Sequence, residues 1–259
     1  MLINRPPSAV SMWLGMLMML LNPVARGAEI VESKSSFTSQ GKTIDVEVFA
    51  PKKSGKYPGI VVLHGAGGMR PEGFGFAFRE YARQLARNGY VAHIVHYFNR
   101  TGHQVAADET VMKQHFADWL KAVGDGVTHL ASQPNVDPKR IGLLGFSLGA
   151  YLSLSEAMFD PRVSAVVEYF GGLPEVLAKD LKRLPPVLIL HGEADRVVPV
   201  KEAEALERLF QEKSVTYEKK IYPGQGHGFL GADGIDAVQR ATAFFEKYVK
   251  NGVPAPKAG

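Results

Sequence analysis

Residues 141–149 read Ile-Gly-Leu-Leu-Gly-Phe-Ser-Leu-Gly, and Ala150 opens a helix-compatible stretch that extends to Met158. The apolar start predicts a buried strand, so Ser147 stands between a strand and a helix. Glycines two residues before and two residues after the serine leave room for a tight, strained turn that exposes its hydroxyl. The pattern therefore predicts a nucleophile elbow with Ser147 as the candidate nucleophile. A chance match is the alternative in a chain with 27 glycines, but the strand-before, helix-after context favours the elbow.

Two later loops supply the partners that a serine nucleophile needs. A serine hydroxyl is a weak nucleophile, so it requires a base to take its proton and a carboxylate to orient that base. Asp195 lies in the loop after one expected strand, and His227 lies in a glycine-rich loop after the last one. The chain order Ser147, Asp195, His227 is the nucleophile, acid, base order of α/β-hydrolases.

Each partner has an alternative interpretation. Asp195 could instead cap the helix expected from Val200, a common position for aspartate. Glu193 is the competing acid, although the later position of Asp195 in the loop suits the acid better. His227 could be an ordinary loop histidine among the eight in the chain. Its flanking glycines and its place after the last strand favour the role of base.

An oxyanion hole needs two backbone N–H groups aimed at the substrate carbonyl oxygen. Leu148, directly after the serine, is expected to supply one of them. Residues 64–68, His-Gly-Ala-Gly-Gly, have the His-Gly-x-Gly pattern of hydrolase oxyanion loops, and we assign the second N–H to Ala66, with Gly67 as the alternative. A dinucleotide-binding loop does not fit, because Arg70 stands where the third glycine of that motif is required.

The rest of the chain alternates apolar strands with amphipathic helices. Two alternating segments, 35–39 and 43–49, flank the turn Gln40-Gly41 and predict an antiparallel hairpin. Further strands are expected at 59–63, 91–97, 141–146, 163–170, 186–190 and 216–221, and helices at 76–88, 108–132, 150–158, 200–213 and 233–250, with a short helix within 174–184. This order predicts an α/β class protein with the α/β-hydrolase fold, a mostly parallel central sheet covered by helices on both faces. There is no room for a large lid domain, so we expect an open, shallow site.

Composition limits the function classes. The 259 residues are 46% hydrophobic, enough for a single catalytic domain over residues 28–259. Thirty basic residues against 26 acidic ones, without a long block of one sign, argue against a nucleic-acid partner. The absence of cysteine excludes a thiolate nucleophile and disulfides. His93 and His96 lie three apart on an expected strand and so face opposite sides, and we expect no metal or organic cofactor.

Residues 1–27 have the pattern of an export signal. Arg5 is followed by an apolar stretch over 9–21, an Asn-Pro breaker and the small-x-small sequence Ala-Arg-Gly. We expect cleavage after Gly27, with Ala28 as the next candidate. The apolar stretch is shorter than the roughly 20 residues of a membrane-spanning helix, so no stable membrane insertion is expected after cleavage. A secreted or periplasmic location follows.

With the elbow and the loops of His64, Asp195 and His227 in this order, the chain resembles the dienelactone hydrolase family of the α/β-hydrolases over residues 42–250. The resemblance implies the fold and acyl chemistry. It does not imply dienelactone as substrate, because the founding members use a cysteine nucleophile whereas this chain has Ser147.

Residues 97–102, Tyr-Phe-Asn-Arg-Thr-Gly, are also similar to that family's loop after its second parallel strand. Tyr97 and Arg100 are candidate substrate contacts there, with Arg100 suited to hold a carboxylate. A solvated arginine beside a partly buried aromatic is the alternative.

The resulting hypothesis is an exported serine hydrolase that cleaves a small-molecule carboxylic ester through an acyl-enzyme on Ser147, with thioesters and lactones as further substrate candidates. Two alternatives stay open. One is a noncatalytic binding or scaffold protein that keeps the hydrolase fold. The other is a small peptidase of the prolyl-oligopeptidase type, which shares the order of the triad.

Overall fold

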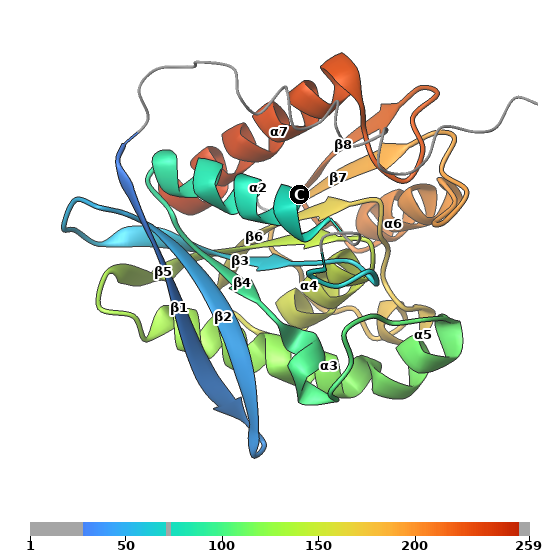
Figure 1. Ribbon diagram of the computed structural model, residues 1–259. Helices are drawn as coiled ribbons and strands as arrows, with labels where there is room; N and C mark the ends of the chain where they lie inside the picture. Colours follow the sequence, from blue (N-terminus) through green and yellow to red (C-terminus); the bar gives the residue numbers. More distant parts are fainter. Residues whose placement is uncertain (1–27, 71–73, 254–259) are drawn as a thin grey trace, which may run out of the picture.

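The protein is built on one eight-stranded sheet, in the strand order β1-β2-β4-β3-β5-β6-β7-β8 (Figure 1). The structure, a computed structural model, describes residues 28–70 and 74–253. The strands are β1 (Ile30–Ser39), β2 (Lys42–Pro51), β3 (Tyr57–Leu63), β4 (Val91–Val95), β5 (Val136–Phe146), β6 (Val163–Tyr169), β7 (Val187–Gly192) and β8 (Tyr217–Tyr222). Strands β3 to β8 run parallel, whereas β1 and β2 are antiparallel to their neighbours. The prediction of a mostly parallel α/β sheet is confirmed.

The antiparallel edge of the sheet is the predicted hairpin. Ser39 pairs with Lys42, which leaves Gln40 and Gly41 as a two-residue loop. Both loop residues have a positive φ, 44° and 80°, the backbone geometry that matches the twist of a tight hairpin. The strands on either side are longer than predicted, because pairing continues from Ser39 back to Ile30.

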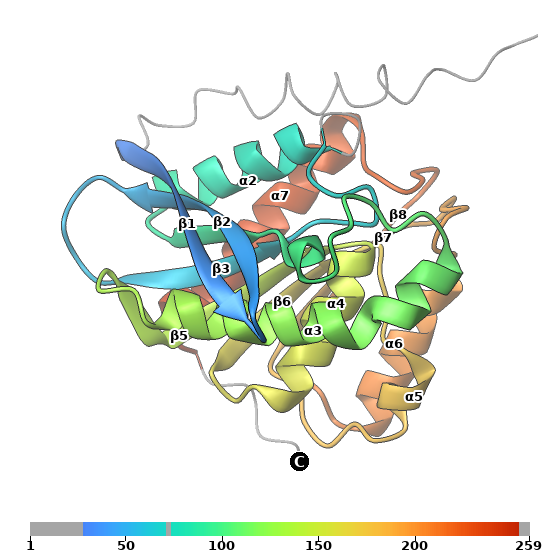
Figure 2. The ribbon, with the colours of Figure 1, turned by 60° about the horizontal axis from the view of Figure 1, so that its bottom comes forward.

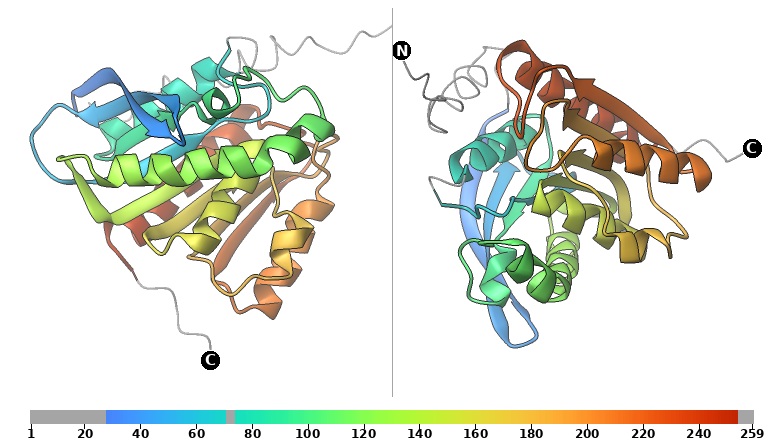
Figure 3. Two further views of the ribbon diagram at one scale, coloured as in Figure 1. Left: turned by 90° about the horizontal axis from the view of Figure 1, so that it is seen from below. Right: turned by 90° about the vertical axis from the view of Figure 1, so that its right-hand side faces the viewer.

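Helices cover both faces of the sheet, as predicted (Figures 1 and 2). They are α2 (Gly75–Arg87), α3 (Glu109–Ala131), α4 (Leu148–Phe159), α5 (Glu175–Ala178), α6 (Lys201–Glu212) and α7 (Gly231–Phe245), with a 3₁₀ turn η2 (Tyr97–Arg100) and a π-helical turn η3 (Glu246–Lys250). Buried residues of α3, α4 and α6 form one core layer, and those of α2 and α7 form the other. Figure 3 shows the two layers from below and from the side.

Helix α3 packs one apolar stripe, with residues at spacings of four and three, against the core. Val123, Val127 and Leu130 are fully buried, and so is Trp119. Asp108 begins the helix by accepting a hydrogen bond from the Val111 N–H at 3.0 Å. The helix packs beside α4 and η2 and contacts strands β1, β3, β4 and β5.

One predicted strand ends early. Strand β4 ends at Val95 rather than at residue 97, because the chain turns there into η2 and buries Tyr97 and Phe98 in the core. The helix expected within 174–184 is the single turn α5.

The predicted export signal lies outside the described residues. Within the described ranges, none of the helices has both the length and the apolar character that crossing a bilayer requires.

Candidate active site

Ser147 lies in the tight turn between β5 and α4, with φ 54° and ψ −120°. A side chain rarely adopts this backbone conformation, so the surroundings must hold it. The Ser147 N–H donates to the Tyr169 carbonyl at 2.9 Å. A Cβ at Gly149 would lie 2.3 Å from the Leu63 carbonyl oxygen, and one at Gly145 would lie 2.3 Å from the Gly149 carbonyl oxygen. Both glycines are therefore required by close backbone approach, and the elbow geometry follows.

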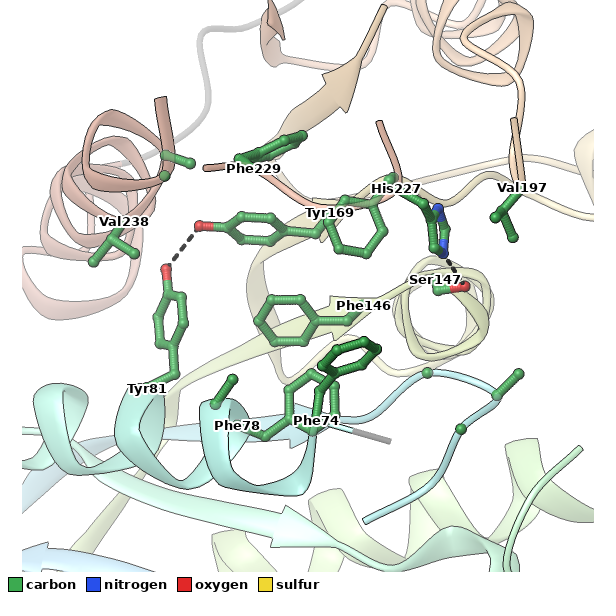
Figure 4. Close-up of a pocket in the computed structure, with 17 residues that line it drawn as sticks. Phe74, Phe78, Tyr81, Phe146, Ser147, Tyr169, Val197, His227, Phe229 and Val238 are labelled. Carbon is green, nitrogen blue, oxygen red and sulfur yellow. Dashed lines mark hydrogen bonds between the residues drawn. The ribbon is translucent and has the colours of Figure 1, made fainter. Parts of the chain in front are cut away.

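The structure brings the three predicted triad residues together, each from a different strand end. The Ser147 hydroxyl lies 3.0 Å from His227 Nε2 (Figure 4). His227 Nδ1 lies 2.7 Å from Asp195 Oδ2. With the Nδ1–H donated to the carboxylate, Nε2 is free to accept the serine proton. The arrangement can therefore increase the nucleophilicity of Ser147.

Asp195 is buried and held as a carboxylate. Burial by itself would raise its pKa, but the hydrogen bond from His227 and those from the Val197 and Val198 N–H groups lower the pKa below its usual value. A charged Asp195 favours the imidazolium form that His227 takes on receiving the serine proton.

The two alternatives for the acid do not fit the structure. Helix α6 begins at Lys201 after Val200, without a side-chain cap, so Asp195 is not its N-cap. Glu193 is exposed and accepts a hydrogen bond from the Gly224 N–H at 3.2 Å.

A buried histidine beside the triad was missed by the sequence analysis. His191 Nε2 lies 3.7 Å from Asp195 Oδ2 and donates to the Val198 carbonyl at 2.8 Å. Burial lowers the pKa of His191, so the ring packs beside the carboxylate as a neutral group. A histidine at the end of an apolar strand, four residues before the acid, was the signal for this neighbour.

The predicted oxyanion loop approaches the serine closely. A Cβ at Gly65 would lie 3.3 Å from the Cβ of Ser147, and Ala66 lines the pocket next to the serine. The Ala106 N–H donates to the Ala66 carbonyl at 2.9 Å and so fixes the loop. Leu148 is the first residue of α4, where backbone N–H groups have no partner inside the helix. The assignment of the two donors to Ala66 and Leu148 stays a prediction.

Tyr97 and Arg100, the predicted substrate contacts, have partners inside the protein. Tyr97 is fully buried, stacks on the His64 ring at 4.1 Å and donates its hydroxyl hydrogen to the His64 carbonyl at 2.7 Å. Arg100 pairs with Asp118 at 3.1 Å and also bonds Gln40. Neither residue lines the pocket. Tyr97 acts instead from behind the site, by supporting the backbone of the oxyanion loop.

His64 is the other half of that support. Its Nδ1 lies 2.8 Å from the Gly65 carbonyl oxygen, and complete burial lowers its pKa to about 3. The imidazole is therefore neutral and donates its Nδ1–H to that carbonyl. A fixed, uncharged histidine at this position stiffens the turn between Leu63 and Ala66.

A pocket of about 240 Å³ opens from Ser147 into the space between α2 and α7. Aromatic rings form much of its wall (Figure 4), from Phe74, Phe78, Tyr81, Phe146, Tyr169, Phe170 and Phe229. The expectation of an open, shallow site is therefore wrong. Residues of α2, β5, β6 and α7 meet here and leave a cavity. The sequence predicts them only as core residues. In the described part of the chain, no group of histidine and acidic residues could hold a metal ion.

The sequence profile of the dienelactone hydrolase family matches residues 44–250. The chain belongs to this family. A protein of Methylorubrum extorquens, described provisionally as a carboxymethylenebutenolidase, is 27% identical over 197 residues, which cover 69% of this chain and 65% of that protein. A carboxymethylenebutenolidase homolog of Xenopus tropicalis is 27% identical over 146 residues, 52% of this chain and 58% of that protein. The matched region thus spans less than two thirds of either relative.

Solved structures agree with the fold. A dienelactone hydrolase-like promiscuous phosphotriesterase from metagenomic libraries superposes with a TM-score of 0.75 at 23% identity, over 85% of this chain and 98% of the other. The sequence match places this chain in a family of hydrolases. The sheet topology and the solved structure show that it has the α/β-hydrolase fold.

This dienelactone hydrolase family member also buries an acidic side chain beside its nucleophile. Glu168 lies near the end of β6 and is fully buried. Its Oε2 accepts a hydrogen bond from the Gly171 N–H at 2.8 Å, and its Oε1 has no partner among the described residues. Burial raises the pKa of Glu168 to about 8, so the group is a neutral carboxylic acid below that pH. It fixes the turn that holds Phe170, whose ring packs on His227 at 4.6 Å.

Replacing Glu168 with glutamine should change how stability depends on pH. The unfolded chain releases this proton near the usual pKa of 4.5, whereas the native state keeps it to about 8. Between these values the native state binds more protons, so the free energy of unfolding of the wild type falls as pH rises. Glutamine does not ionise, so the free energy of unfolding of Glu168→Gln lacks this decrease. The measurement is urea unfolding at about pH 5 and about pH 8. The free energy of unfolding of the variant, relative to that of wild type, should be at least about 1 kcal/mol higher at the higher pH than at the lower one.

The matched control is Glu204→Gln, a substitution of an exposed glutamate on α6. It should follow the wild-type pH dependence. If the free energy of unfolding depended on pH equally in Glu168→Gln and in wild type, Glu168 would be ionised in the native state.

Proposed function

We propose that this protein is a serine hydrolase of carboxylic esters that works through an acyl-enzyme on Ser147. The observation that carries the proposal is the continuous hydrogen-bond chain from Ser147 Oγ through His227 to the buried Asp195. A serine, histidine and carboxylate in this geometry are the arrangement of acyl-transfer enzymes on several unrelated folds. Membership of a hydrolase family supports the same conclusion.

The reaction begins when Ser147 Oγ attacks the acyl carbon while its proton passes to His227 Nε2. The tetrahedral intermediate carries its negative oxygen toward the N–H groups of Leu148 and Ala66. His227 then gives the proton to the departing alkoxide, and the carbon–oxygen bond breaks. Water, deprotonated by the same histidine, attacks the acyl-enzyme and releases the acid, which restores Ser147.

Export is part of the proposal, and it is supported by the sequence of residues 1–27. A secreted or periplasmic enzyme would work on esters outside the cytosol.

A fluorophosphonate probe and a substrate screen test the function together. The probe, which reacts with activated serines, should label the purified protein, and para-nitrophenyl esters should be hydrolysed. A thioester, a lactone and a peptide substrate in the same screen define the bond that is cleaved. Folded protein that neither reacts with the probe nor cleaves any ester would support the noncatalytic alternative. Cleavage of the peptide alone would support the peptidase.

A further inference from the structure

Two tyrosine hydroxyls meet at the end of the pocket that lies away from the nucleophile (Figure 4). Tyr81 comes from α2 and Tyr169 from β6, and both line the pocket. Their hydroxyl oxygens are 3.0 Å apart, a hydrogen bond between side chains that are 88 positions apart in the sequence. The triad uses neither hydroxyl.

The pair has hydrogen-bonding capacity to spare. Each phenol has one proton and can also accept, so one proton is used within the pair and the other is available. Neither hydroxyl makes another hydrogen bond within the described residues. A buried polar group that lacks a partner costs free energy, so a ligand that supplies one is favoured.

The pocket wall around the pair is mostly apolar. Phe146 stacks on Tyr169 with ring centres 4.8 Å apart, and Phe78 and Val238 lie beside the pair. Burial raises the pKa of both tyrosines, so they are neutral at ordinary pH. The pocket wall has no arginine, lysine, aspartate or glutamate among its described residues. A charged group would therefore lose its hydration here without gaining an opposite charge.

We propose that this pocket accepts an uncharged, apolar arm of the ester and that the Tyr81–Tyr169 pair hydrogen-bonds a neutral polar group, such as a hydroxyl, at the end of that arm. The proposal rests on the ester hydrolysis proposed above and names its substrate class. The volume of about 240 Å³ suits an aromatic ring with a short linker, because an engineered apolar cavity of about 150 Å³ already holds benzene. Such an arm would stack against the rings of the wall while its hydroxyl meets the tyrosine pair.

Matched esters with and without the terminal hydroxyl test the proposal. Two pairs vary the acyl part: methyl para-hydroxyphenylacetate and methyl para-hydroxyphenylpropanoate, each compared with the same ester that lacks the hydroxyl. One pair varies the alcohol part: para-hydroxyphenethyl acetate compared with phenethyl acetate. In at least one pair, wild type should prefer the hydroxylated ester in kcat/KM by about 10-fold, the value of one buried hydrogen bond. The para-carboxy analogues should be at least about 100-fold poorer than the parents.

Tyr81→Phe and Tyr169→Phe keep the rings and remove one hydroxyl oxygen each. Because the hydroxyl left in either single variant can still bond the ligand, the decisive test is the double variant, in which the preference for the hydroxylated ester should fall to about 1. Because the readout is a ratio within one enzyme, a general loss of activity cancels. The control is Tyr90→Phe, which removes a buried hydroxyl that has no partner in the described residues and lies outside the pocket wall. It should keep the wild-type ratio.

Three results would overturn the proposal: equal rates for every hydroxylated ester and its parent, a preference that persists when both tyrosine hydroxyls are removed, or carboxylated esters cleaved as fast as the parents. Each of these requires measurable ester hydrolysis. If no ester is cleaved at all and the fluorophosphonate probe does not react, the proposed function itself has failed, so the two failures are distinguishable.

Discussion

Ser147→Ala should reduce kcat/KM for a cleaved ester by a factor on the order of 10⁵, because the acyl-enzyme cannot form without the hydroxyl. The substitution removes one oxygen at a position whose backbone is held by the Tyr169 carbonyl and by close glycine contacts. The fold should therefore persist, and circular dichroism should match that of the wild type. Residual activity would come from the oxyanion donors and from substrate binding alone.

Ser155 in α4 provides the control for this experiment. Ser155 donates its hydroxyl hydrogen to the Tyr151 carbonyl at 2.7 Å within the helix and does not line the pocket. Ser155→Ala should keep both the activity and the reaction with fluorophosphonate. Activity within tenfold of wild type in Ser147→Ala would show that another residue is the nucleophile.

Asp195→Asn should lower kcat by a factor on the order of 10⁴, with little change in the fold. The amide keeps the shape of the carboxylate, but it cannot stabilise the imidazolium and favours the wrong tautomer of His227. Hydrolysis of the same ester across the pH range is the measurement, because the loss should persist at every pH at which the variant is folded.

Glu193→Gln is the control that distinguishes the two acids of this loop. Its side chain is exposed and bonds the Gly224 N–H rather than His227. Its kcat should stay close to the wild-type value. If Glu193→Gln lost activity while Asp195→Asn kept it, the assignment of the acid would be reversed.

The sequence was most informative where a local pattern determines the geometry. The glycines around Ser147 are required by contacts within a few ångströms, and the turn at Gln40 and Gly41 follows from residue type alone. Strand and helix order then predicts the sheet, because strands that alternate with helices run parallel. Asp195 and His227 could be found because both follow strands at the same edge of that sheet.

The pocket could not be predicted from the same patterns. Tyr81 and Tyr169 each have the spacing of an ordinary core residue, and only tertiary packing places their hydroxyls 3.0 Å apart. The end of β4 was misjudged for a similar reason, since burial of Tyr97 against His64 turns the chain two residues early. Glu168 did leave a signal, a single acidic residue in the apolar run Val163 to Phe170, but its neutral state depends on burial that only the structure shows.

The left-handed backbone at Ser147 has a consequence for how this protein can evolve. That conformation costs a residue with a side chain roughly 1–3 kcal/mol, whereas glycine adopts it freely. The chain would therefore fold more favourably with glycine in place of this serine, so selection for stability and selection for catalytic activity oppose each other at this position.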